Sequence, residues 1–134
     1  MRWLAALPLL GALTVVGCGS GPSYTHANGG TLHITLDEYR VIPQNLTVPA
    51  GRVRIVATNK GRLTHNLAVE AWEKEDGEEP KLYGRTPTLH PGQTGTEQEP
   101  ITLKPGKYRL TDTIGNHDDL GQYGELKVTS AKGS

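Results

Sequence analysis

The segment from Tyr108 to Val128, YRLTDTIGNHDDLGQYGELKV, most strongly constrains what this chain can fold into. Its first five and last five residues are rich in Tyr, Leu, Thr and Val, a composition that favours two β-strands. The loop between them contains Gly115, Gly121 and Gly124, whose permissive backbone allows tight turning. The segment is therefore predicted to be two strands joined by a loop that brings spaced side chains together.

Three potential metal donors occur in this loop at five-residue intervals: Asp112, His117 and Gln122. A fourth donor, His65, lies in the segment ATNKGRLTHNLAV, at the edge of another strand-like run. Two imidazoles, a carboxylate and an amide oxygen make a reasonable ligand set for a divalent ion. The sequence therefore indicates a metal site formed by His65 and the loop.

The remainder of the chain also has the pattern of short β-strands. Thr31–Leu36 (TLHITL) alternates apolar and polar residues, as expected of a strand with one buried face. Further strands are predicted at 46–49, 53–58 and 66–71, and Pro-Gly pairs at 91–92 and 105–106 mark turns. Because the chain has no internal repeat and no long helical periodicity, residues 31–130 are predicted to form one all-β domain of β-sandwich size.

Two motifs carry a resemblance to a known family. The first is N-x-G-x-x-x-H-N around His65, and the second is Y-x-x-x-[C]-T-x-x-x-H-x-x-x-G-[M]-Y-G from Tyr108 onwards, with other residues at the two bracketed positions. Together they resemble the cupredoxins, Greek-key β-sandwiches that hold a mononuclear blue-copper centre. The resemblance implies that His65 and His117 are the two imidazole ligands. It also places Asp112 where the family has its ligand Cys, and Gln122 where the family has its weak axial Met.

The two altered ligands have unequal consequences. Gln is a tolerated axial ligand in blue-copper sites, so Gln122 is a permitted variant. Asp112 replaces a soft thiolate by a hard carboxylate, and the resulting nitrogen and oxygen donors favour Cu(II) or Zn(II) over Cu(I). The expected cofactor is therefore copper in a thiolate-free site, with zinc as the alternative, and a fast copper electron carrier is disfavoured.

The N-terminus predicts export and anchoring. Residues 1–17 have signal-peptide architecture, and Val15-Val16-Gly17-Cys18 resembles the bacterial lipobox, in which the Cys is lipidated. The alternative is an ordinary secretory signal with an incidental Cys. Residues 18–30 are predicted to be a flexible tether and residues 131–134 a C-terminal tail. Cys18 is the only cysteine, which excludes an internal disulfide.

Other polar residues receive simpler interpretations. His26, His33 and His90 are expected to be a linker, a surface-strand and a loop residue, respectively. The acidic run WEKEDGEEPKL from Trp72 is expected to be a solvated loop, with a partner-docking surface as the alternative. Asp118 and Asp119 are expected to face solvent and are left out of the ligand set.

Composition and motifs exclude several function classes. The formal net charge is +0, with acids and bases interspersed, so no basic patch indicates nucleic-acid binding. The chain has no nucleophile elbow, no Gly-rich phosphate loop and no His-Glu-x-x-His pattern, so it is not expected to be an enzyme. A monomer is expected.

Three hypotheses about function follow. The first is an extracytoplasmic module, anchored to a bacterial membrane through Cys18, that binds a divalent metal, foremost Cu(II), through His65, Asp112, His117 and Gln122. The second is an electron-transfer copper protein with a redox or copper-handling protein partner. The third is a cupredoxin-like scaffold without metal that serves as a binding module, since fold alone does not confer function.

Overall fold

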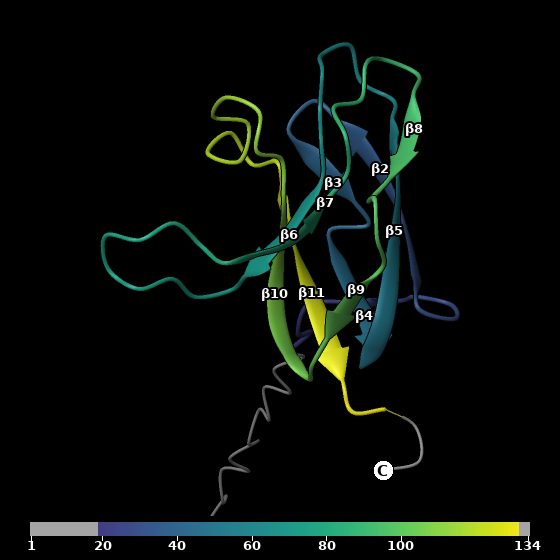
Figure 1. The fold of residues 1–134 in the computed structure, drawn as a ribbon, viewed down its shortest axis with the longest axis vertical. Coiled ribbons are helices and arrows are strands. Elements are labelled where there is room, and N and C mark those ends of the chain that lie inside the picture. Colours follow the sequence, from purple (N-terminus) through teal and green to yellow (C-terminus); the bar gives the residue numbers. More distant parts are fainter. Residues whose placement is uncertain (1–18, 132–134) are drawn as a thin grey trace, which may run out of the picture.

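The computed structural model describes residues 19–131 (Figure 1). The predicted signal peptide, Cys18 and the last three residues of the predicted tail lie outside the described residues. The described chain forms two β-sheets packed face to face, which confirms the predicted all-β sandwich (Figure 1). Within residues 19–131, no helix is long and apolar enough to cross a membrane.

The first sheet has the strand order β1-β4-β11-β10-β6-β7. Its strands are, in sequence order, β1 (Thr25–His26), β4 (Asn45–Pro49), β6 (Ala68–Ala71), β7 (Leu82–Arg85), β10 (Gly106–Thr111) and β11 (Tyr123–Thr129). The second sheet has the order β3-β2-β5-β8, with β9 also paired to β5. Its strands are β2 (Thr31–Asp37), β3 (Arg40–Ile42), β5 (Gly51–Asn59), β8 (Thr94–Thr96) and β9 (Ile101–Leu103).

Alternation of apolar and polar residues sets the face that each strand buries. In β2, Leu32, Ile34 and Leu36 are buried while His33 is exposed, as the sequence predicts. The facing sheet contributes Leu110 from β10 and Leu126 from β11, both fully buried. Because the chain contains no Phe, branched aliphatic residues fill most of the space between the sheets.

The segment that constrains the fold most lies at the centre of the first sheet. β10 and β11 pair in antiparallel register from Gly106↔Val128 to Thr111↔Tyr123, and β11 pairs in parallel with β4. In the connecting loop, Gly115 and Gly121 adopt positive φ values of 57° and 106°, which L-residues rarely tolerate. This loop lies at one end of the sandwich (Figure 1).

Part of the segment expected to be a flexible tether is folded. β1 pairs in parallel with β4, with Thr25 opposite Leu46. Just before β1, Tyr24 donates a hydrogen bond from its hydroxyl to Oε1 of Glu125 at 2.5 Å. The first strand of the sheet therefore precedes residue 31, because a two-residue edge strand that composition does not reveal finds backbone partners in β4. His26 of β1 is exposed, yet Nδ1 of its ring lies 2.7 Å from Oγ1 of Thr47.

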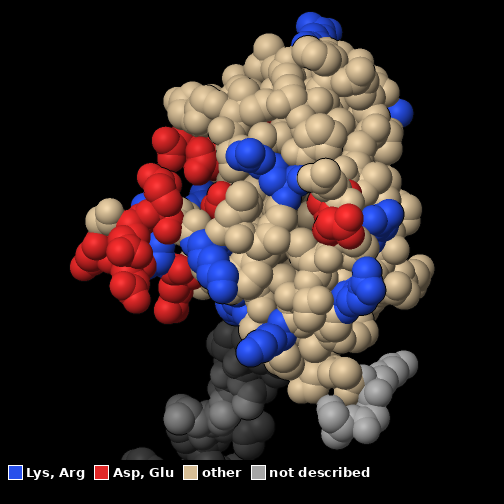
Figure 2. All heavy atoms as spheres, in the orientation of Figure 1, with Lys and Arg blue, Asp and Glu red and all other residues tan. Residues whose placement is uncertain are grey.

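The acidic run forms the loop of a hairpin between β6 and β7. This loop projects from the body of the sandwich, and acidic side chains gather on it (Figures 1 and 2). Residues 72–79 are all exposed, in agreement with the expected solvated loop.

The two ends of the sandwich differ in what they carry. The β10–β11 loop lies at one end, and both ends of the described chain lie towards the opposite one (Figure 1).

Candidate metal centre

His65 is held rigidly at the start of the first ligand segment. Its backbone N–H donates to the carbonyl of Leu89 at 3.0 Å, and its carbonyl accepts from the N–H of Leu89 at 2.7 Å. Its side chain is fully buried. The loop before it is ordered by the buried Asn59, whose amide donates to the carbonyls of Leu63 and Leu89. The Asn of the first motif thus fixes the approach of the chain to His65.

Asp112 follows directly after β10, and its carboxylate is fully buried. Its Oδ2 lies 2.7 Å from Nδ1 of His65 and 2.8 Å from Nδ1 of His117. Its Oδ1 accepts from the backbone N–H groups of Ile114 at 2.9 Å and Asn66 at 3.3 Å. One buried carboxylate therefore joins two segments that are distant in the sequence.

Asn66 holds the two segments together next to this carboxylate. Its side-chain oxygen accepts from the backbone N–H of Thr113 at 2.8 Å, and its Nδ2 donates to Oγ1 of Thr113 at 2.9 Å. The second Asn of the motif therefore fastens the His65 segment to the β10–β11 loop.

His117 lies in the turn of the loop, and its side chain is 15% exposed. Its ring centroid is 5.1 Å from that of His65 and 5.7 Å from that of Tyr39. Both histidines present Nδ1 to Asp112, so their donor atoms converge on one point. His65, Asp112 and His117 offer ligand atoms within 4.8 Å of one another.

Gln122 precedes β11, and its side chain is fully buried. Its backbone N–H donates to the carbonyl of His117 at 3.0 Å, and its carbonyl accepts from the N–H of Asp112 at 3.3 Å. Among residues 19–131, neither Nε2 nor Oε1 of its side chain has a hydrogen-bond partner. A buried amide without a partner is costly, so this side chain is available to a further partner.

The structure adds one residue that sequence reasoning missed. Glu38 lies in the turn between β2 and β3, and its Oε1 is 3.3 Å from Nε2 of His65. The same oxygen accepts from the backbone N–H groups of Arg62 at 2.5 Å and Leu63 at 2.9 Å. The hydrogen bond from Leu63 is the main reason that the pKa of the Glu38 carboxyl lies below its usual value. No motif could have revealed this contact, because the turn belongs to a different part of the chain.

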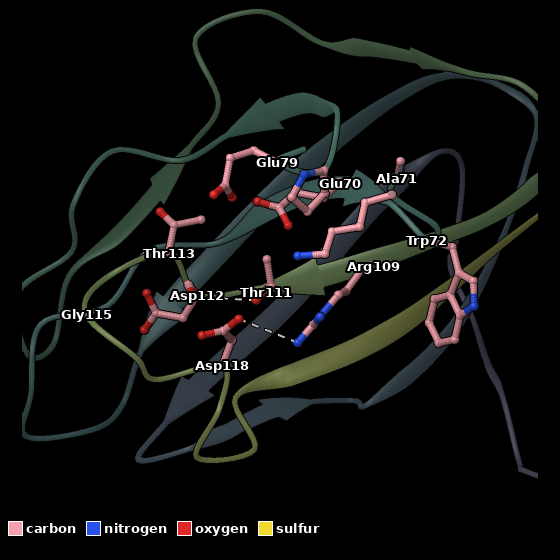
Figure 3. Close-up of a pocket in the computed structure, with 12 residues that line it drawn as sticks. Glu70, Ala71, Trp72, Glu79, Arg109, Thr111, Asp112, Thr113, Gly115 and Asp118 are labelled. Carbon is pink, nitrogen blue, oxygen red and sulfur yellow. Dashed lines mark hydrogen bonds and ion pairs between the residues drawn. The ribbon is translucent and has the colours of Figure 1, made fainter. Parts of the chain in front are cut away.

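The remaining polar candidates have other surroundings. Asp118 is directed to Arg109, with its Oδ2 3.6 Å from Nη2, and both line a pocket of about 370 Å³ beside the acidic hairpin (Figure 3). Burial raises the pKa of Glu70 in this pocket. Asp119 and His90 are exposed.

The fold also defines a class of protein. Its two sheets pack face to face, with His65 before β6 and Asp112, His117 and Gln122 between β10 and β11. No protein-family model and no curated protein sequence matches the chain. Solved structures do match it, and they are cupredoxins.

Three of these structures illustrate the likeness. Reduced auracyanin from Roseiflexus castenholzii is 21% identical, with a TM-score of 0.64 over 75% of this chain and 97% of that chain. Auracyanin A, a "blue" copper protein from Chloroflexus aurantiacus, is 18% identical, with a TM-score of 0.62 over 78% and 100%. A purple cupredoxin from Nitrosopumilus maritimus is 17% identical, with a TM-score of 0.52 over 73% and 99%. The chain has the cupredoxin fold.

Proposed function

We propose that this chain is a membrane-tethered, extracytoplasmic module that binds a divalent metal, foremost Cu(II), in a site without a thiolate. His65, Asp112 and His117 would be the main ligands, with Gln122 as a weak fourth. The observation that carries the proposal is the convergence of two Nδ1 atoms on one buried carboxylate oxygen.

The donor set fits a divalent ion. Imidazole and carboxylate donors suit Cu(II), which heads the affinity order of divalent first-row metals, and Zn(II) also accepts these ligands. Bound copper would supply a Lewis-acidic and redox-active centre. The Gln122 amide, which has no partner among residues 19–131, supports the fit, because a bound ion would satisfy its oxygen.

The hydrogen bonds around Asp112 favour a different candidate function, a scaffold that binds no metal. Both carboxylate oxygens already have partners, so the buried charge is compensated as the cluster stands. The same scheme leaves Gln122 unsatisfied, and for this reason we favour the metal site.

Exposure of His117 favours electron transfer as a second candidate function. One edge of the cluster reaches the surface there, beside Leu120, which is 51% exposed and bonded through its N–H to the His117 carbonyl. A redox or copper-handling protein partner could approach a monomeric domain at this edge. The missing thiolate argues against fast transfer, since a hard donor set resists the change to Cu(I).

The first prediction concerns metal content and colour. The domain expressed from Ser20 should bind about one equivalent of Cu(II), because the cluster offers a single set of converging donors. Its visible spectrum should be pale, since the intense blue band requires a copper–thiolate bond and the domain has no cysteine. Titration calorimetry, absorption and electron paramagnetic resonance measure these properties. A metal-stripped sample that takes up neither Cu(II) nor Zn(II) would favour the scaffold.

The second prediction concerns anchoring. Cys18 lies outside the described residues, and the first described residues lie at the end of the sandwich opposite to the metal centre (Figure 1). A lipid on Cys18 would therefore leave the centre accessible. Cys18→Ala should cause misprocessing of the protein or its release from the membrane fraction of its bacterial host, whereas Ser20→Ala, two residues away, should do neither. A wild-type protein that is wholly soluble, with Cys18 unmodified, contradicts the proposal.

A further inference from the structure

We infer that Glu38 is a positioning residue of the metal centre: it accepts the Nε2–H of His65 and thereby presents Nδ1 of that ring to the ion. This inference rests on the proposed metal-binding function. It assigns a role to a residue that belongs to neither ligand motif.

The contacts of Glu38 fix its carboxylate in place. Its Oε1 accepts from the backbone N–H groups of Arg62 and Leu63, and it lies 3.3 Å from Nε2 of His65. Because the two backbone donors belong to the loop that leads to His65, the carboxylate and the ring are held by the same loop. The approach of Glu38 to the ring is therefore built into the fold.

The geometry of the imidazole ring determines what Glu38 can do. The two ring nitrogens point to different sides, and Nδ1 of His65 faces Asp112 while Nε2 faces Glu38. Glu38 therefore cannot bind an ion that is held by Nδ1. A proton on Nε2 satisfies Glu38 and leaves the lone pair of Nδ1 for the metal. A carboxylate that accepts from a ligating histidine fixes its tautomer and orientation and raises its basicity.

The two histidines differ in this respect. His117 contacts Asp112 through Nδ1 and packs its ring against Tyr39, and no described carboxylate contacts its Nε2. Glu38 therefore acts on only one of the two imidazoles. This asymmetry makes His117 an internal reference in any experiment that resolves the two rings.

Gly61 makes the approach of Glu38 possible. A Cβ at this position would lie 2.2 Å from Oε1 of Glu38 and 3.1 Å from Nε2 of His65. The nearer atom is the end of a flexible side chain, so Gly61→Ala would displace the carboxylate from the ring without changing any charge. The charge of Glu38 and its contact with the ring can thus be removed by separate substitutions.

The experiment compares the domain expressed from Ser20 with its E38Q, G61A and D37N variants. E38Q removes the negative charge of the Glu38 side chain, and G61A prevents its carboxylate from approaching the His65 ring. D37N is the control for charge, because Asp37, the last residue of β2, pairs with Arg40. Asn at this position keeps the Oδ1 atom that accepts from the backbone N–H of Glu38. Thermal melts check that each variant folds. Cu(II) affinity is then measured by competition with a chelator, and the ring nitrogens are followed by ¹⁵N NMR of the Zn(II)-loaded protein.

We expect G61A to lower the Cu(II) affinity by roughly 10–100-fold, the usual effect of losing a histidine's outer hydrogen-bond partner. E38Q should lower it less, because the amide oxygen of Gln can still accept the Nε2–H of His65 but carries no charge. D37N should stay near the wild-type value. In the wild type, the Nε2–H proton of His65 should be protected from exchange with water, and this protection should be lost in G61A. The signals of His117 should not change.

The outcomes separate the two proposals. A wild-type domain that binds neither Cu(II) nor Zn(II) overturns both. A wild-type domain that binds metal, with unchanged affinity and unchanged His65 signals in folded E38Q and G61A, overturns only the role of Glu38. An equal loss of affinity in D37N also overturns it, because general charge would then explain the effect.

Discussion

Asp112→Cys is expected to turn the pale domain intensely blue when Cu(II) is added. The substitution would complete a set of two imidazoles and one thiolate, with Gln122 as the weak axial group, which is the ligand pattern of blue-copper sites. The change should be measured in the domain expressed from Ser20, which lacks Cys18. Any new sulfur-to-copper absorption band then arises from position 112 alone.

The positions of the present side chains support this expectation. Oδ2 of Asp112 is in direct hydrogen-bonding contact with both Nδ1 atoms, so it occupies the point at which the donors converge. A cysteine sulfur is bonded directly to Cβ, whereas Oδ2 is one bond further out. The shorter side chain therefore makes room for an ion between the sulfur and the two rings. The N–H groups of Ile114 and Asn66, which now donate to Oδ1, favour a negatively charged group at this position.

The control for this experiment is Asp119→Cys. It introduces the same thiol in the same loop, but at an exposed position outside the cluster, and it should produce no intense band. A folded Asp112→Cys variant that stays colourless in Cu(II), with its thiol freely titratable, shows that the assigned ligand set is wrong.

Loss of either histidine should nearly abolish metal binding. Each of His65→Ala and His117→Ala removes one of only two nitrogen donors in the cluster. We therefore expect a loss in Cu(II) affinity that exceeds the roughly 10–100-fold cost of losing an outer hydrogen-bond partner. In the wild type, metal at about 100 times its dissociation constant should add about 2.7 kcal/mol to the free energy of unfolding, which raises Tm by roughly 10 °C or more. Differential scanning calorimetry with and without Cu(II) measures this shift.

The matched control is His33→Ala, because His33 is an exposed histidine on β2 outside the cluster. The His33 variant should keep the full metal-induced rise in Tm, and the two cluster variants should lose it. A rise that persists in His65→Ala and His117→Ala would place the copper elsewhere on the surface.

The sequence alone was enough to predict the sandwich and to select the candidate ligands. Alternation in TLHITL and the two strand-like runs around the glycine loop reflect side-chain burial, which is local information, and the structure confirms them as β2, β10 and β11. The spacing of Asp112, His117 and Gln122 lies within one loop, so their proximity could be inferred. His65 was added from its place at the edge of another strand-like run, and its motif resembles that of a known family.

Other features were decided by contacts between segments that are distant in the chain. β1 forms because β4 offers it backbone hydrogen-bond partners. The composition of residues 19–30, GSGPSYTHANGG, is that of a tether and does not indicate a strand. Likewise, Glu38 reaches His65 because the β2–β3 turn and the loop after β5 meet at one end of the sandwich and Gly61 leaves room between them. The sequence by itself determined which residues could bind a metal, since donor chemistry belongs to the side chains. Only the tertiary structure decided that Nδ1 of His65 faces Asp112 and that Nε2 faces Glu38. These contacts depend on how the two sheets pack.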